Sequence, residues 1–228
     1  MEQNVQHQLA ATWFVLIAMV CFGMAFFPFS GFLPPLPATM TAQEVATYFK
    51  EHGHGIRFSM ILLLEAGAFF SIIVALISLQ IRRIEQSPSI LTYTQLIAGA
   101  VGSAVIIIGG CLMTTVAFRP ERPIEVTYLL YDLSWMFVIM PSTSYTLQFF
   151  ATGLAILSDR RSMPLFPRWV GYYNIWTGLA IAPGLLIPYF HSGPFAWNGL
   201  ISFWLGVVAF GGWFVIMFFA LRRAIRTP

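Results

Sequence analysis

Six long runs of apolar residues alternate along the chain with short segments that carry charges, proline and glycine. The runs lie near residues 9–33, 56–82, 90–118, 124–158, 167–190 and 195–222. Each exceeds the roughly 20 residues that a helix needs to cross a hydrocarbon core of about 30 Å. Backbone polar groups in lipid must be paired within the segment, which favours helices. The pattern predicts an all-α polytopic membrane bundle of six transmembrane helices, forming one transmembrane domain over residues 1–228.

Composition supports lipid as the solvent of this chain. Of its 228 residues 58% are hydrophobic and 9% are charged, whereas soluble domains carry roughly 25% charged residues. The net charge of +3 is small, and its basic residues sit in short clusters between apolar runs, which is typical of membrane topology and not of nucleic-acid binding. The lipid bilayer is therefore the expected partner, and nucleic acid is not.

Basic residues are divided unevenly between the two sides of the predicted bundle. Because Lys and Arg accumulate in cytoplasmic connections, the side with more of them is expected to face the cytoplasm, and both termini lie on that side. Eight arginines share the side of the termini: Arg82, Arg83, Arg160, Arg161, Arg168, Arg222, Arg223 and Arg226. The other side carries four basic residues: Lys50, Arg57, Arg119 and Arg122.

The longest outer connection, residues 33–56, contains its own helical signals. It opens with "LPPLP", which is stiff because proline fixes φ and lacks an N–H donor. Thr41 and Glu44 fit a capping box, and Gly53 fits a helix stop. We expect a short amphipathic outer-surface helix near 41–52, lying with its apolar face on the membrane.

Two carboxylates stand inside apolar runs and are the candidate catalytic residues. The run that holds Glu65 starts near Arg57, eight residues earlier, or about 12 Å at 1.5 Å per residue. Asp132 lies seven residues after Glu125, where the fourth run starts, which gives about the same depth. The pattern predicts that both carboxylates face one outward-leaning cavity.

An intramembrane charge needs compensation, because it costs at least about 2.5–3.5 kcal/mol at the bilayer centre. Each acid can be protonated, the two can share a proton, or one can pair with Arg57 or Arg119. If the site is catalytic, one acid donates a proton and the other acts as base or electrostatic stabiliser. The structural alternative is a hydrogen bond that only holds helices together.

The fourth run supports a cavity with one polar and aromatic wall. At 100° per residue a single stripe collects most of its polar and amphipathic groups, and Pro141 lies within the stripe, where it can kink the helix. The stripe contains Glu125, Tyr128, Asp132, Trp135, Ile139, Ser142, Thr143 and Thr146. The candidate binding residues are Arg57, Arg119, Glu125, Tyr128, Tyr131 and Trp135.

Metal and cofactor chemistry finds little support in the sequence. His52, His54 and His191 lie in outer connections. Together with Glu51 or Glu125 they are weak candidates for a metal site. Their spacing fits no standard zinc pattern. The apolar runs contain neither a histidine pair for haem nor a lysine for a retinal Schiff base, and P-loop and HExxH motifs are missing. We therefore expect no cofactor and no metal.

Several motifs in the second half of the chain carry a family resemblance. They are "FRPERP", "YDLSW", "FPRWVGYYNIWTGL" and "GPFAWNGL". In these motifs the chain resembles uncharacterised bacterial multi-pass integral membrane proteins. The resemblance implies a bacterial inner membrane location and no activity.

The leading functional hypothesis is binding or processing of an apolar or amphipathic small molecule around Glu65 and Asp132. The sequence leaves open whether the protein is an enzyme. One alternative is a dimeric proton-coupled transporter, in which the acids carry protons. Another is a non-catalytic subunit or assembly factor of a membrane complex, whose acids pair with a partner membrane subunit or with a second copy in a homo-oligomer.

Overall fold

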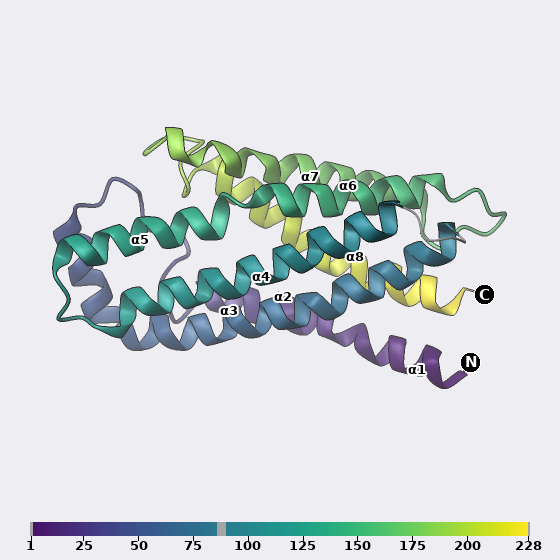
Figure 1. Cartoon of the computed structure of the whole chain (residues 1–228), viewed down its shortest axis with the longest axis horizontal. Helices are drawn as coiled ribbons and strands as arrows, with labels where there is room; N and C mark the ends of the chain where they lie inside the picture. Colours follow the sequence, from purple (N-terminus) through teal and green to yellow (C-terminus); the bar gives the residue numbers. More distant parts are fainter. Residues whose placement is uncertain (1, 86–89, 228) are drawn as a thin grey trace.

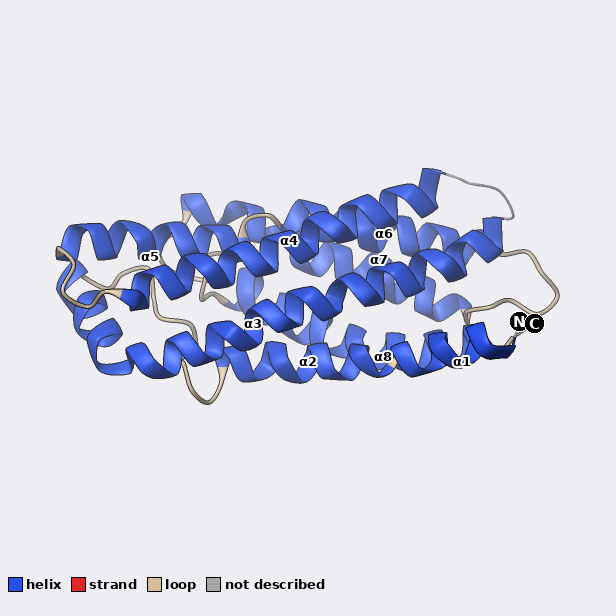
Figure 2. Cartoon of the chain, turned by 60° about the horizontal axis from the view of Figure 1, so that its bottom comes forward, coloured by secondary structure: helices blue, strands red, loops and turns tan. Residues whose placement is uncertain are grey.

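The computed structural model describes residues 2–85 and 90–227, which form helices joined by short connections without strands (Figures 1 and 2). Two elements depart from α-helical geometry: η1 is a 3-10 helix and η2 is a π-helix. In chain order the elements are α1 (Glu2–Ala11), α2 (Trp13–Phe26), α3 (Ala42–Glu85), α4 (Ile90–Phe118), α5 (Ile124–Ile139), α6 (Ser142–Ser158), α7 (Arg168–Ile181), η1 (Ala182–Tyr189), η2 (Leu200–Leu205) and α8 (Gly206–Arg226).

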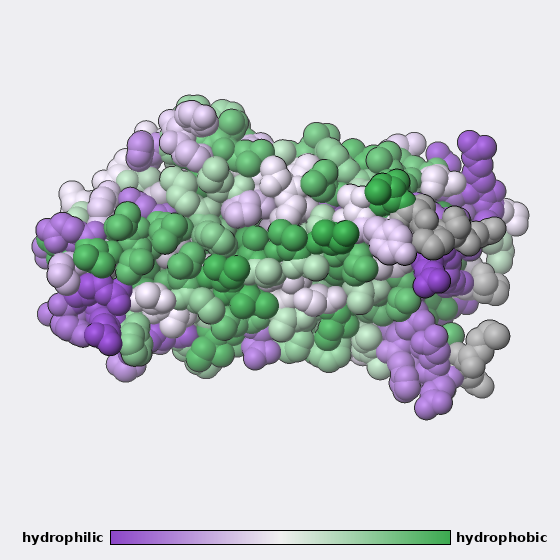
Figure 3. Space-filling view, in the orientation of Figure 1, coloured by the Kyte–Doolittle hydropathy of each residue, from purple (hydrophilic) through white to green (hydrophobic). Residues whose placement is uncertain are grey.

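Six helical stretches among the described residues are long and apolar enough to cross a membrane, as the apolar runs predict. The molecular surface agrees, because a hydrophobic middle lies between two hydrophilic ends (Figure 3). The chain is therefore a multi-pass membrane protein with an all-helical fold. The six stretches are Gln3–Phe26, Ala42–Glu85, Ile90–Phe118, Ile124–Ser158, Arg168–Tyr189 and Leu200–Arg226.

The helices lie along one long axis, and both termini are at the same end of the bundle (Figure 1). Helix α3 packs against α2 on one side and α4 on the other, and α6 packs against α4 and α7. The C-terminal helix α8 packs against α2 and α7, which brings the first and last spans of the chain together. The candidate functional site lies between these two spans.

Helix α3 is longer than the sequence pattern predicts. Thr41 and Glu44 do form a capping box, with the Thr41 N–H donating to Glu44 Oε2 at 2.8 Å and the Glu44 N–H donating to Thr41 Oγ1 at 3.3 Å. The helix does not stop at Gly53, however, so residues 42–52 are its first turns and not a separate short helix. The nearby Gly55 serves close packing, because a Cβ there would lie 2.2 Å from the Phe29 carbonyl oxygen.

The segment between α2 and α3 folds over one end of the bundle and is held there by three aromatic side chains. The Tyr48 hydroxyl donates to the Ser30 carbonyl at 2.8 Å. The Tyr131 hydroxyl and the Trp197 indole N–H both donate to the Leu36 carbonyl, at 3.1 and 2.8 Å. The bonds of Tyr131 and Trp197 connect the loop to segments more than 90 residues later in the sequence.

Three spans depart from a continuous α-helix: the fourth near its middle, the fifth in its last third and the sixth at its start. Helix α5 ends at Ile139 and α6 begins at Ser142, with Pro141 between them, as the predicted kink requires. The fifth span changes from α7 to the 3-10 helix η1 at Ala182, and the sixth begins as the π-helix η2 before becoming α8 at Gly206. Irregular backbone at membrane depth persists where it is buried in protein or lines a cavity.

Candidate functional site

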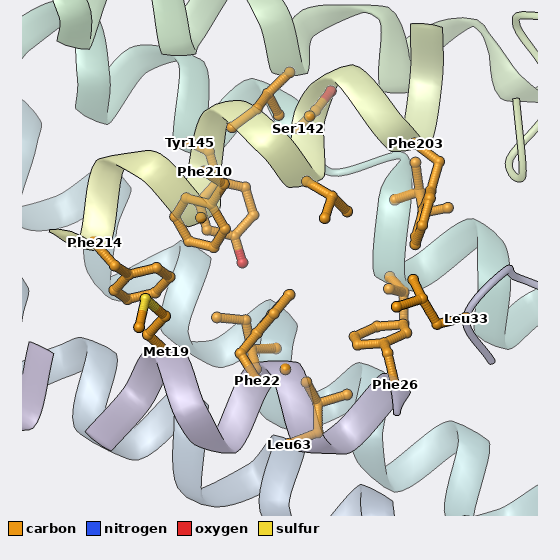
Figure 4. A pocket seen from close by; sticks show the side chains of 18 of the residues that line it. Met19, Phe22, Phe26, Leu33, Leu63, Ser142, Tyr145, Phe203, Phe210 and Phe214 are labelled. Carbon is orange, nitrogen blue, oxygen red and sulfur yellow. The ribbon is translucent and has the colours of Figure 1, made fainter. Parts of the chain in front are cut away.

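An apolar cavity of about 260 Å³ lies between the first and last spans (Figure 4). Its walls are made by side chains from almost every helix of the bundle, with aromatic rings on several sides. The residues that line it are Met19, Phe22, Gly23, Phe26, Leu33, Leu63, Ile106, Val138, Ile139, Ser142, Tyr145, Ile181, Ser202, Phe203, Gly206, Val207, Phe210, Gly211 and Phe214.

Phenylalanine rings form the largest part of the wall. Phe22 and Phe26 project from α2, and Phe210 and Phe214 project from α8 on a neighbouring side of the cavity (Figure 4). The rings of Phe22 and Phe210 pack edge to face, with centroids 5.7 Å apart. Phe203 of η2 contacts Phe26 at 6.2 Å between centroids. The wall is therefore a set of mutually packed rings, which holds its shape better than flexible aliphatic chains.

The hydroxyl groups in the wall are already used by the protein. The Tyr145 hydroxyl donates to the Gly102 carbonyl at 2.7 Å. Ser202 lies within hydrogen-bond distance of the Pro183 and Phe195 carbonyls, at 3.2 and 3.0 Å. The Ser142 hydroxyl, the third in the wall, lies 3.4 Å from the Met140 carbonyl oxygen. Each of these three hydroxyl groups has an acceptor within the protein, so the cavity favours an apolar body.

The three helix interruptions all border the cavity. Ile139 and Ser142 flank the break at Pro141, and both line it. Ile181 is the last residue of α7, and Gly206 is the first residue of α8. Departures from α-helical geometry, π-helical turns above all, are frequent at functional sites, so their convergence on one cavity marks it as the candidate functional site.

Two glycines make the cavity wall thin between α2 and α8. A Cβ at Gly23 or at Gly211 would meet no atom within 4 Å. Gly23 is exposed and Gly211 is half-buried, so the cavity extends toward the bundle surface between these two helices. Both glycines lie in helical stretches that are long and apolar enough to cross a membrane, Gly23 in Gln3–Phe26 and Gly211 in Leu200–Arg226. This side of the cavity therefore lies within the apolar part of the bundle.

Glu65 lies outside this cavity. It follows the lining residue Leu63 by two positions, which turns it by about 200° to the opposite face of α3. Its side chain is exposed, on the same surface as Ile61, which is 57% exposed. No hydrogen bond or ion pair joins it to another described residue, and its electrostatic neighbour is Cys21 of α2.

Asp132 lies at a different level from Glu65, so the predicted shared depth is wrong. The ring of its neighbour Tyr131 packs on Phe49, with centroids 6.0 Å apart. Phe49 precedes Glu65 by 16 residues on the same helix, which is more than four helical turns. The error arises because α3 begins at Ala42, well before the start at residue 56 that fixed the predicted depth. Asp132 is half-buried near His191 and does not line the cavity.

None of the other candidate binding residues lines the cavity. Tyr131 and Trp135 are fully buried; Tyr131 holds the α2–α3 loop, and Trp135 stacks on the Trp197 ring with centroids 6.2 Å apart. Tyr128 stacks on Tyr131 at 6.4 Å between centroids. The three charged candidates, Arg57, Arg119 and Glu125, do not line the cavity. Arg57 forms a hydrogen bond with His54 at 3.2 Å, and Arg119 lies over the Phe118 ring. Glu125 is exposed.

The histidines do not come together. His52 stacks on Tyr48 with ring centroids 4.2 Å apart, and His54 contacts Arg57. His191 is exposed beyond the end of η1. The part of the chain that the structure describes contains no group of three or more His, Cys, Asp or Glu side chains arranged to hold a metal ion.

The sequence pattern identifies part of this site and misses the rest. Ile139 and Ser142 belong to the predicted stripe of the fourth run, and they do line the cavity. Phe22 and Phe210 have no distinguishing sequence signal, because phenylalanine on a transmembrane helix faces lipid as often as a cavity. The sequence does show where helices can be broken, because Pro141 and Pro183 lie within apolar runs. Broken transmembrane helices tend to border binding sites in membrane proteins.

Comparison of the chain with protein-family models, curated proteins and solved structures finds no significant match.

Proposed function

We propose that this protein binds an apolar or amphipathic small molecule in the cavity between α2 and α8, and that the molecule enters from the bilayer. The observation that carries the proposal is the convergence of three helix interruptions on one apolar, ring-lined cavity. We further propose, from the arginine excess at the end that holds both termini, that this end lies in the cytoplasm of a bacterial inner membrane.

The energetics argue against a cavity that stays empty. An enclosed apolar cavity left empty costs about 24 cal/mol per Å³ in a protein core, so about 6 kcal/mol is the upper limit for this volume of about 260 Å³, which is partly open to the bundle surface. Whole domains are stable by only about 5–15 kcal/mol. An apolar guest that fills the space offsets this cost, and a smaller apolar cavity of about 150 Å³ already binds benzene in another protein.

The wall chemistry restricts the part of the guest that the cavity holds. Aromatic faces and aliphatic side chains surround it, and the hydroxyl protons of Tyr145 and Ser202 are engaged by backbone carbonyls. The bound part is therefore a hydrocarbon chain or ring, and any polar end lies outside. Neither Glu65 nor Asp132 lines the cavity, so the proposal is one of binding and not of acid–base catalysis.

Extraction of the purified protein tests this proposal. We expect the wild-type protein to retain one apolar molecule per chain that is distinct from the bulk phospholipid, detected by mass spectrometry of a solvent extract. Gly23→Leu should lose it, because Gly23 lines the cavity and a Cβ added there would meet no atom within 4 Å. Leu129→Ala is the matched control, since Leu129 is 67% exposed on α5 and is not a lining residue. Equal extracts from all three proteins would contradict the proposal.

A second candidate function, membership of a membrane complex, is favoured by one observation. Glu65 presents a carboxyl group on the lipid-facing side of the bundle, without a hydrogen-bond partner among the described residues. A partner helix that donates a hydrogen bond at this depth would satisfy it. If so, Glu65→Leu should reduce the particle size in native gels while Glu65→Gln and the neighbouring Ile61→Ala keep it. An unchanged size with Glu65→Leu argues against the complex.

A further inference from the structure

A second hollow lies on the outside of the bundle, in the groove between α7 and α8. It has a volume of about 230 Å³ and shares no residue with the cavity. Three of its side chains are largely exposed: Trp169 at 54%, Val215 at 41% and Phe219 at 65%. The groove is lined by Pro167, Trp169, Val170, Val215, Ile216, Phe219, Ala220 and Arg223.

The groove reaches from the polar end of the bundle into its apolar middle. Pro167 immediately precedes α7, and Arg223 lies in the last turn of α8. From Arg223 to Val215 the floor runs eight residues, or about 12 Å, toward the middle of the span. Trp169 stands at the polar end, where tryptophan is typical of the membrane–water interface. One half of the groove therefore lies at headgroup level and the other among acyl chains.

The polar end of the groove carries positive charge that the protein does not neutralise. The termini and connections at this end hold eight arginines against three acidic residues, Glu2, Glu85 and Asp159. Asp159 is already paired with Arg161 at 2.8 Å. Within residues 2–85 and 90–227, the guanidinium groups of Arg223 and Arg168 donate no hydrogen bond.

The neighbouring arginines Arg83 and Arg222, unlike Arg223 and Arg168, donate hydrogen bonds within the protein. Arg83 donates to the carbonyls of Ala224 and Thr227, and Arg222 donates to Thr12 and lies over the Trp13 ring. Those side chains tie the ends of the chain together. Arg223, one residue later, instead lines the groove and has no such role.

We propose that the groove between α7 and α8 binds an anionic phospholipid. One acyl chain lies on the floor formed by Val215 and Phe219, and the phosphate lies against Arg223, with Arg168 at the start of α7 adding charge. Arginine suits this role because its planar guanidinium donates two parallel hydrogen bonds to phosphate oxygens. The uncompensated arginines favour an anionic over a zwitterionic headgroup. The proposal is independent of the cavity and its guest.

Native mass spectrometry of the purified full-length chain, titrated with phosphatidylglycerol or phosphatidylcholine, tests the site. We expect tighter binding of phosphatidylglycerol by the wild type. Arg223→Gln should weaken that binding about fivefold, the loss expected for one basic side chain near an anionic headgroup. Val215→Gln should weaken both lipids, because it places an amide on the apolar floor. Arg82→Gln, an exposed arginine at the same end and outside the groove, should have no effect.

Three results would overturn the proposal. The first is equal affinity of the wild type for the two lipids. The second is an equal loss with Arg82→Gln and Arg223→Gln, which would indicate diffuse attraction to the whole end. The third is displacement of phosphatidylglycerol by inorganic phosphate alone, which would indicate an anion site that does not use the acyl chain. If Arg223→Gln fails a thermal-melting check for folding, Arg168→Gln replaces it in the same titration with the same expected direction.

Discussion

Filling the cavity from one of its own glycines should stabilise the protein and abolish binding at the same time. Gly211 lies on α8, and a Cβ added there would meet no atom within 4 Å. Gly211→Leu therefore adds its side chain to open space. Removing one buried leucine side chain elsewhere leaves about 150 Å³, so the added leucine should occupy more than half of the 260 Å³ cavity.

The expected gain in unfolding free energy is the sum of a contribution from filling the cavity and a contribution from helix propensity. At about 24 cal/mol per Å³, filling 150 Å³ is worth up to about 3.6 kcal/mol, and replacing a helical glycine by leucine adds about 0.8 kcal/mol. Lipid chains that partly enter the cavity reduce the gain, so we expect about 2–4 kcal/mol. At roughly 2–4 °C per kcal/mol for a chain of this size, the melting temperature should rise by at least about 4 °C.

The assay compares melting temperature and apolar-probe binding in the same delipidated preparation. Naphthalene serves as the probe, and its affinity should fall at least tenfold with Gly211→Leu. Gly153→Leu is the matched glycine control, because a Cβ at Gly153 would lie 2.8 Å from the Gly171 carbonyl oxygen and should lower the melting temperature. A lower melting temperature for Gly211→Leu, or unchanged naphthalene binding, would refute the reasoning.

Three further predictions test other parts of the account. Burial raises the pKa of Asp159, but hydrogen bonds from Arg161 and from the Leu165 N–H outweigh it and hold the pKa below its usual value. This stabilisation is fully present above about pH 4 and is lost as pH falls through the lowered pKa, so the drop in melting temperature caused by Asp159→Asn should be largest at pH 7 and shrink as the pH is lowered below 4. The buried Trp213 indole N–H donates to the Asn174 side-chain oxygen at 2.9 Å. Asn174→Leu removes this acceptor and should lower the unfolding free energy by about 1–3 kcal/mol in chemical denaturation. Trp213→Phe in the same background should recover part of the loss. Pro141→Ala should join α5 and α6 into one helix and reduce the affinity for naphthalene. Unchanged affinity would show that the helix break is not needed to form the cavity.

The helical framework could be predicted from the sequence because hydrophobicity alone defines it. The run at 90–118 coincides with α4 at both ends, and the capping box of Thr41 and Glu44 forms as its spacing requires. The stop at Gly53 was wrong because a glycine is compatible with both a helix end and a close helix contact. In the structure Gly53 lies beside the end of α4, where an added Cβ would be 3.6 Å from the Ala117 carbonyl oxygen.

The site was harder to predict because its position depends on helix register. Glu65 and Asp132 were expected at one depth, and the early start of α3 at Ala42 separates their levels. The cavity also joins residues from opposite ends of the chain, such as Phe22 and Phe210. No local pattern reports that contact. Pro141 was the local signal that did point to the cavity, since it breaks the span beside Ile139.

Photolabelling in proteoliposomes with a diazirine-bearing alkane distinguishes a binding cavity from ordinary contact with lipid. The alkane mimics the hydrocarbon guest, and the labelled positions can be mapped by peptide mass spectrometry. We expect saturable labelling of Phe22 and Phe210, which excess unlabelled alkane suppresses and Gly211→Leu abolishes. Labelling that never saturates and is spread over lipid-facing residues such as Leu129 and Val208, exposed by 67% each, would contradict a binding cavity between α2 and α8.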